Sequence, residues 1–154
     1  MTFHLTSPAF ESGEDIPKEF TCDGPDSSPP LIWTDPPPGT ETLALIVDDP
    51  DAPSDTWVHW VLYNLPPIAR GLPECVVKDR QLPDGTRQGR NDFGKLGYNG
   101  PCPPRGAPHR YFFKLYALDC KVKLKLGASN GVIHGRAMKR HVLAKAELVG
   151  RFQH

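Results

Sequence analysis

Apolar and polar residues alternate along several short stretches of this 154-residue chain. The clearest, His109–Asp119, carries Tyr, Phe, Leu and Ala at one set of alternate positions and Phe, Lys, Tyr and Leu at the other. This period of two predicts a β-strand, and because both faces are largely apolar we expect a central strand covered on both sides. Lys121–Leu126 and Val142–Phe152 alternate as well. Further strands are predicted at Phe3–Ser7, Leu31–Thr34, Thr42–Asp48 and Trp57–Asn64.

Helices contribute little to the predicted fold. The chain has 18 Pro and 14 Gly, which disfavour long helices and favour strands joined by shaped loops. We expect one helix, from about Ser129 to Arg140 with Ser129 as its N-cap. Gly131 and Gly135 each cost it about 1 kcal/mol relative to Ala, so packing would have to hold it. The prediction is a mainly all-β protein forming one domain over residues 1–154.

The stretch from Pro66 to Pro108 is unusual in its length and composition. Its 43 residues contain eight Pro and seven Gly. Loops this long inside compact domains are usually functional or disordered. Phe93, Leu96 and Tyr98 would give this one apolar anchors, so we expect an ordered, functional loop.

Charge and segment patterns exclude several classes of function. Lys and Arg total 18, as do Asp and Glu, so the basic surplus expected of a nucleic-acid binder is missing. Met1–Asp15 has no signal-peptide pattern, and the longest aliphatic run, Leu43–Val47, is far shorter than the ~20 residues that span a bilayer. We expect a protein without a transmembrane segment, located in the cytoplasm.

The four cysteines form no C-x-x-C pair and do not resemble a secreted disulfide scaffold. Reduced thiols are therefore expected. A Cys22–Cys102 pair is the alternative, because both residues sit in loops rich in Gly and Pro, and the sequence leaves it open.

The first group of candidate site residues runs from Asp48 to His59. A strand ends in three nearby carboxylates, turns on two prolines and returns as an aromatic strand, Trp57-Val58-His59-Trp60. A rigid turn capped by aspartates would by itself explain this motif, without any binding function. Asp49 or Asp51 beside His59 would instead raise the imidazole pKa and fix its tautomer, and such a histidine can donate to an anion.

The second group is Gly100-Pro101-Cys102-Pro103-Pro104 followed by His109-Arg110-Tyr111. The simple interpretation is a loop that leads into the central strand. In the functional interpretation, the loop forms a rigid wall of a binding site and exposes backbone N–H groups. His109 and Tyr111 then point to the same side, because they are two positions apart on a strand.

Two other patterns carry less weight. Gly127-Ala128-Ser129-Asn130-Gly131 matches the hydrolase motif G-x-S-x-G, but the only acid downstream is Glu147, so we interpret Ser129 as a helix cap. A metal held by Asp49, His59 and His109 has no ligand motif to support it. We therefore predict no metal and no cofactor.

Taken together, the two groups resemble the phosphatidylethanolamine-binding protein family, in particular its bacterial and archaeal branch of Raf-kinase-inhibitor-like proteins. Further similar stretches are Thr21-Cys22-Asp23-Gly24, Ser28-Pro29-Pro30-Leu31, Asn91-Asp92-Phe93-Gly94 and His141-Val142-Leu143-Ala144. The resemblance runs from near Phe3 to Phe152.

This resemblance implies an antiparallel β-sandwich with short helices and long Pro/Gly-rich loops, and a small pocket at one edge. It also implies a cis Ala52–Pro53 bond and a supporting role for Asp51 in the turn. Eukaryotic members carry a C-terminal helix beside the pocket, whereas this chain ends soon after its last strand. We therefore expect a more open mouth, or one closed by the partner of a homodimer. The predicted ligand-binding residues are Asp49, Asp51, Pro53, Trp57, His59, Gly100, Pro104, His109 and Tyr111.

The expected function is non-enzymatic binding of a small anion or phosphorylated headgroup, with a regulatory role. One alternative is inhibition of a kinase or hydrolase by surface contact, although nothing in this chain supports transferring the eukaryotic kinase partner. The other is a weak hydrolase using Ser129 or a His/Asp pair.

Overall fold

The computed structural model describes residues 3–53, 55–124 and 138–154. Almost all of their regular structure is β-strand, with one short 3-10 helix, η1. The elements are β1 (Leu5–Thr6), η1 (Lys18–Phe20), β2 (Leu31–Trp33), β3 (Thr42–Asp49), β4 (Trp57–Leu65), β5 (Gly71–Leu72), β6 (Arg87–Gln88), β7 (His109–Leu118) and β8 (Val142–Phe152).

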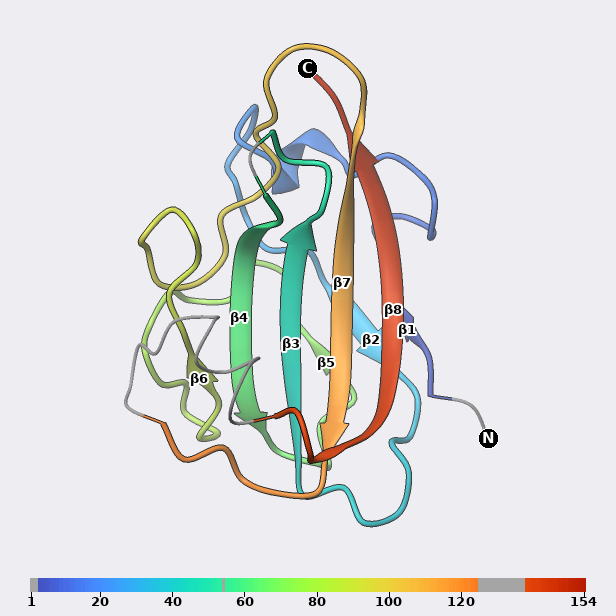
Figure 1. The fold of residues 1–154 in the computed structure, drawn as a ribbon, viewed down its shortest axis with the longest axis vertical. Helices are drawn as coiled ribbons and strands as arrows, with labels where there is room; N and C mark the ends of the chain where they lie inside the picture. The colour runs from blue at the N-terminus through green and yellow to red at the C-terminus, as the bar shows by residue number, and fades with distance from the viewer. Residues whose placement is uncertain (1–2, 54, 125–137) are drawn as a thin grey trace.

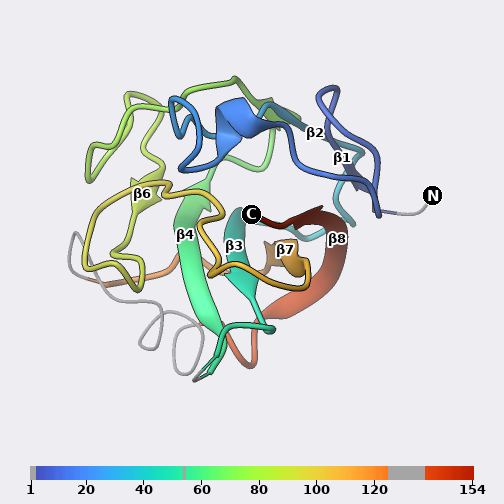
Figure 2. The same cartoon turned by 90° about the horizontal axis from the view of Figure 1, so that it is seen from above.

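These strands form two sheets in which every pairing is antiparallel. The larger has the order β6-β4-β3-β7-β8 and the smaller β1-β2-β5. The small sheet lies behind the large one in Figure 1, and the end-on view of Figure 2 shows the large sheet curving beside it. The predicted antiparallel β-sandwich is confirmed.

The alternation of side chains along the strands explains how both faces of the large sheet are covered. On β3, Leu43, Leu45 and Val47 join the core that Leu31 and Trp33 of the small sheet complete. The intervening residues of β3 belong to a second buried cluster on the opposite face, with Val58, Tyr63, Tyr116, Leu118 and Val122. The strand β7 contributes to both clusters, so the prediction of a central strand covered on both sides is correct.

Lys121–Leu126 was expected to be a strand, and this expectation is wrong for the part that the structure describes, residues 121–124. The backbone of Val122 bonds to a side chain instead of a neighbouring strand. Its N–H donates to Asn64 Oδ1 at 2.7 Å, and Asn64 Nδ2 donates to its carbonyl at 2.8 Å. These two bonds satisfy the segment without a sheet partner.

The Ala52–Pro53 bond is trans, not cis. Trans is the intrinsically favoured isomer, and the turn is held without a cis bond because the Asp51 N–H donates to Asp49 Oδ1 at 2.8 Å. Most of the predicted helix, including Ser129 and the G-x-S-x-G motif, lies outside the described residues, while residues 138–140 form a bend and a turn.

The long Pro66–Pro108 segment is ordered around buried anchors. Tyr98 is 1% exposed, and its hydroxyl donates to the Phe20 carbonyl at 2.6 Å. This contact ties the loop to η1. The other expected anchors are weaker, since Leu96 is partly buried and Phe93 is 40% exposed.

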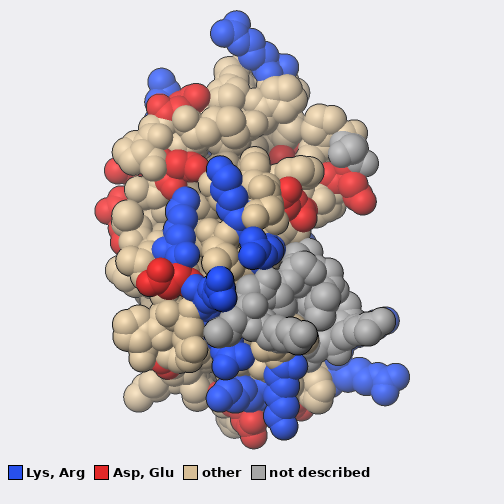
Figure 3. Space-filling model, turned by 90° about the vertical axis from the view of Figure 1, so that its left-hand side faces the viewer, with Lys and Arg blue, Asp and Glu red and all other residues tan. Residues whose placement is uncertain are grey.

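The balanced charge is unevenly spread over the surface. On the side of the molecule seen in Figure 3, Lys and Arg gather in the middle and lower part, whereas Asp and Glu lie mostly toward the upper part. In the part of the chain that the structure describes, no helix is both long and apolar enough to cross a membrane.

Candidate binding site

Three strand ends meet at one end of the large sheet. The strand β3 ends at Asp49, and its antiparallel neighbours β4 and β7 begin there with Trp57 and His109. A cavity of about 290 Å³ opens at this end. Its lining consists of Asp49, Ala52, Pro53, Trp57, His59, Phe93, Cys102, Pro103, Pro104, His109 and Tyr111.

Both predicted groups of residues therefore meet in one cavity, although they are about fifty positions apart in the chain. Seven of the nine predicted site residues line it, and Asp51 and Gly100 do not.

Asp51 holds the neighbouring Arg110 instead. Its carboxylate accepts the backbone N–H of Arg110 at 2.9 Å and two guanidinium N–H groups at 2.9 and 2.8 Å. Hydrogen bonding to Arg110 lowers the pKa of Asp51 to about 2. Asp51 thus fixes the start of β7, next to His109.

Gly100 permits a close approach of two loops. Its N–H donates to Asp26 Oδ1 at 2.8 Å. A Cβ at this position would overlap the carbonyl oxygen of Phe20 and lie 2.6 Å from Asp26 Oδ1. Only glycine allows the loop to lie this close to Phe20 and Asp26, and this close approach positions the cavity wall that follows.

The first functional pair is His109 and Asp49. The Nδ1 of His109 lies 2.7 Å from Asp49 Oδ2, and their side chains are only 12% and 5% exposed. The second oxygen of Asp49 accepts the Asp51 N–H, which fixes the carboxylate. Asp49 therefore orients the imidazole and leaves Nε2 as the ring nitrogen that a ligand would meet.

His59 is held in a similar way by a different acceptor. Its Nδ1 lies 2.6 Å from the carbonyl oxygen of Asn99, so Nδ1–H donates there. Burial lowers the pKa of His59, while the Asn99 carbonyl and the charge of Asp49 act in the opposite direction. Burial therefore makes the charged form of His59 less favourable than it is in water.

Tyr111 lies between the two histidines. Its ring stacks on His109 at 6.5 Å and meets His59 edge-on at 5.3 Å. Burial and the nearby Asp49 raise the pKa of Tyr111, so the phenol stays protonated. Its neutral hydroxyl hydrogen-bonds to the carboxylate of Asp49.

Four lining residues were not predicted. Ala52, Cys102 and Pro103 lie inside the two motifs and could have been found by including every motif position. Phe93 lies in a separate loop and packs edge-on against Trp57 at 5.5 Å and His59 at 5.4 Å. The only sequence signal for it was its place in the Asn91-Asp92-Phe93-Gly94 stretch.

Asn91 shapes the loop that presents Phe93. Its side-chain oxygen accepts the N–H groups of Phe93 and Lys95 at 3.0 and 3.2 Å. Its amide nitrogen donates to the Gly97 carbonyl at 3.0 Å and to Asn99 Oδ1 at 2.7 Å. Because Asn99 also holds His59, one buried amide supports two parts of the pocket.

Cys102 is bonded to Cys22, so the expectation of reduced thiols is wrong for this pair and the alternative is correct; Cys75 and Cys120 are free. The described lining contains no Ser or Thr hydroxyl and no free thiol that could act as a nucleophile.

Asp49, His59 and His109 do not form a compact set of metal ligands. Among the described residues, three donor atoms within 4.8 Å of one another occur at Cys22, Cys102 and His154 and at Asp119, Cys120 and His141. The arrangement suits binding by hydrogen bonds.

Comparisons with known proteins identify the family of this chain. The model of the phosphatidylethanolamine-binding protein family matches residues 6–153. A UPF0098 protein of Methanothermobacter thermautotrophicus is 51% identical over 97% of this chain and 98% of its own length. A solved phosphatidylethanolamine-binding protein homolog from Chlamydia trachomatis has a TM-score of 0.89 at 39% identity, with 99% and 98% of the two chains covered. The solved structure of Escherichia coli YbcL, which is described as a new member of the mammalian phosphatidylethanolamine-binding protein family, has a TM-score of 0.91 at 35% identity. The match covers 100% of this chain and 99% of YbcL. This chain belongs to the phosphatidylethanolamine-binding protein family.

Proposed function

We propose that the pocket binds a small anion or a phosphate-bearing headgroup and does not change it chemically. The observation that carries this proposal is the matched arrangement of His59 and His109. Each ring donates Nδ1–H to a fixed acceptor, so each offers Nε2 to a ligand in the cavity. Two histidines held in this way form a pair of donors for one oxyanion.

In the proposed complex, each of the two imidazole rings carries a proton on both of its nitrogens. An imidazolium has two N–H groups, and here one is accepted by the Asn99 carbonyl or the Asp49 carboxylate while the other points to the ligand. Two imidazolium rings and one carboxylate give a net charge of +1 for an anion. An anion beside His59 opposes the effect of burial on its pKa, so we expect affinity to rise as pH falls.

The expected affinity is modest. Charge-assisted donors contribute about 1.5–3 kcal/mol each, so two give about 3–6 kcal/mol. This range corresponds to dissociation constants from several millimolar to tens of micromolar. Weak, reversible capture suits a regulatory binding protein.

A phosphorylated amine fits the cavity as well as a bare anion. The edge-packed pair Trp57 and Phe93 forms an aromatic wall beside His59. An ammonium group can rest on such rings through cation–π attraction. The family's description as phosphatidylethanolamine-binding supports this choice of ligand.

Isothermal titration calorimetry with inorganic phosphate and with phosphoethanolamine tests the proposal at pH 5.5 and pH 8. We expect binding that is stronger at pH 5.5 and abolished in the double variant His59→Ala, His109→Ala. The matched control is His4→Ala, which removes an exposed histidine. Unchanged binding in the double variant would reject the assignment.

A homodimer, a single domain over the whole chain and a cytoplasmic location are further proposals. Sedimentation velocity tests the first, limited proteolysis the second and cell fractionation the third. Fractionation that finds the protein only in an oxidising compartment, where disulfides such as Cys22–Cys102 persist, would overturn the third.

A further inference from the structure

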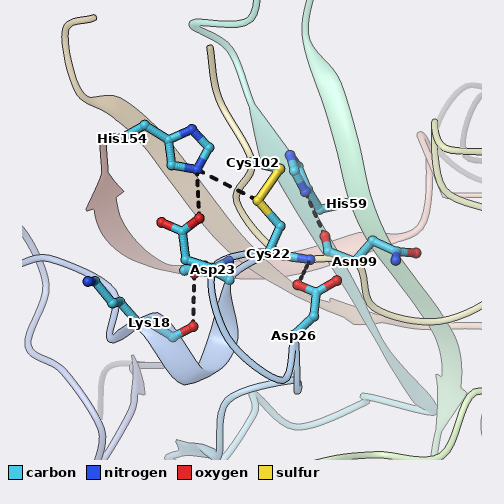
Figure 4. The surroundings of a disulfide bond; sticks show 10 residues. Lys18, Cys22, Asp23, Asp26, His59, Asn99, Cys102 and His154 are labelled. Atoms are coloured by element: carbon cyan, nitrogen blue, oxygen red, sulfur yellow. Dashed lines mark hydrogen bonds and ion pairs between the residues drawn. A yellow bond between two sulfur atoms is a disulfide. The ribbon is translucent and has the colours of Figure 1, made fainter. Parts of the chain in front are cut away.

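A second cluster of reactive side chains lies on the outer side of the cavity wall. Cys22 and Cys102 form the disulfide, and His154 Nε2 lies 3.7 Å from Cys22 Sγ and 3.1 Å from Asp23 Oδ1. Figure 4 shows the imidazole directed at both the sulfur and the carboxylate. None of these contacts is used in the binding of an anion.

We propose that these four residues form a zinc site that opens when the disulfide is reduced. The Sγ atoms of Cys22 and Cys102 and the Nε2 of His154 already lie within 4.8 Å of one another. Two thiolates, one imidazole and one carboxylate are a donor set that tetrahedral Zn²⁺ accepts. Ligand atoms around such an ion lie roughly 3.2–3.8 Å apart. The His154–Cys22 separation of 3.7 Å lies in this range and the His154–Asp23 separation of 3.1 Å just below it, while the two sulfurs reach this spacing only after their bond is broken.

The two cysteines stay together without their covalent bond. The Cys22 N–H donates to the Pro101 carbonyl at 3.1 Å, one residue from Cys102. The bonds from Gly100 to Asp26 and from Tyr98 to Phe20 join the same two segments. Reduction therefore leaves two thiols facing each other, which lowers the conformational entropy lost when a metal binds.

Charge and access also suit a cation of this kind. Zn²⁺ with two thiolates and one carboxylate carries a net charge of −1. Arg105 lines a surface hollow with Asp23 and His154, where it can balance that charge. The same hollow gives an ion a path to the ligands from solvent.

The redox step is a thiol–disulfide exchange with a dithiol reductant. The reductant's two S–H groups become one disulfide, while the Cys22–Cys102 bond becomes two thiols, so two electrons and two protons are transferred. Zn²⁺ then displaces one proton from each thiol. Reoxidation expels the ion, because a disulfide sulfur is no longer a thiolate ligand.

Cobalt(II), a spectroscopic probe for zinc, tests the proposal directly. The protein carries Cys75→Ser and Cys120→Ser, which removes the free thiols and the Asp119, Cys120, His141 cluster. A phosphine reductant reduces it and is removed under anaerobic conditions. We expect one equivalent of Co²⁺ to give the intense visible bands of a tetrahedral thiolate site, and one equivalent of Zn²⁺ to displace it. The oxidised protein should show neither.

Two variants separate a built site from chance thiol binding. Removing a ligand with His154→Ala should weaken Zn²⁺ about tenfold or more, whereas the exposed-histidine control His4→Ala should not. Near-UV circular dichroism should show that the reduced protein remains folded. Reduced protein that binds no Co²⁺, binds it equally well after His154→Ala, or unfolds and is not restored by Zn²⁺ would overturn the proposal.

Discussion

The substitution Asn91→Asp tests whether one buried amide organises the pocket loop. The change preserves shape and keeps the oxygen that accepts the Phe93 and Lys95 N–H groups. It removes the amide donors to Gly97 and Asn99 and a longer contact of 3.4 Å to the His59 carbonyl, and it places a carboxyl oxygen against these three acceptors. The site is 4% exposed, so water cannot replace the lost bonds.

The expected loss of stability follows from those contacts. Two buried hydrogen bonds are lost at about 1 kcal/mol each, and their acceptors are left unpaired at a further cost, so we expect about 3 kcal/mol in total. With a urea m-value of about 2 kcal/mol/M, the unfolding midpoint should fall by about 1.5 M. Burial raises the pKa of the introduced carboxyl, so the destabilisation should grow as pH rises above about 4.

Urea denaturation followed by tryptophan fluorescence at pH 5 and pH 8 measures both effects. The control is Gln81→Glu, the same amide-to-acid change at an exposed position, which should stay within about 0.5 kcal/mol. A loss below 1 kcal/mol that does not depend on pH would refute the role of Asn91.

Three further predictions concern Gly100, the Cys22–Cys102 bond and His59. Gly100→Ala should lower the free energy of unfolding by about 2–3 kcal/mol more than Gly85→Ala in urea titrations, because Gly85 has a positive φ but open space around it. An equal loss would refute the close approach. Replacing Cys22 and Cys102 by Ser should cost about 2–4 kcal/mol by the same measurement, since the bond closes a loop of 80 residues; no loss would mean that the bond does not constrain the unfolded chain. The folded pKa of His59 lies below its unfolded value of about 6.5, so the unfolded chain takes up a proton first as pH falls. Without phosphate, thermal stability should drop below pH 6.5, by at most about 1.4 kcal/mol per pH unit, and less in His59→Gln; an equal drop in that variant would assign the effect elsewhere.

The pattern of apolar residues was sufficient to predict the long strands of the large sheet. In β7 and β8 the alternation reflects burial in the sandwich, whereas β3 and β4 are apolar runs buried on both faces. It failed at Lys121–Leu126 because the alternation of Lys with Val and Leu marks only which side chains are buried. The backbone partner there is the side chain of Asn64, about sixty residues earlier, which no local pattern reveals.

The pocket was predictable where its residues lie in short motifs at strand ends. His59, His109 and Asp49 follow from this, since antiparallel pairing brings the end of β3 beside the starts of β4 and β7. The contributions of Phe93 and Asn91 could not be derived, because they depend on how an irregular loop folds back. The partner of Cys102 was left open for the same reason.

The most direct test of the account is nuclear magnetic resonance of the histidine rings in ¹⁵N-labelled protein during a phosphate titration. We predict that the signals of His59 and His109 shift together with one dissociation constant, and that the protonation midpoint of His59 moves to higher pH. The exposed ring of His4 should stay unchanged. Phosphate that shifts His4 as much as His59 and His109, or leaves those two rings unaffected, would contradict an anion pocket built on these histidines.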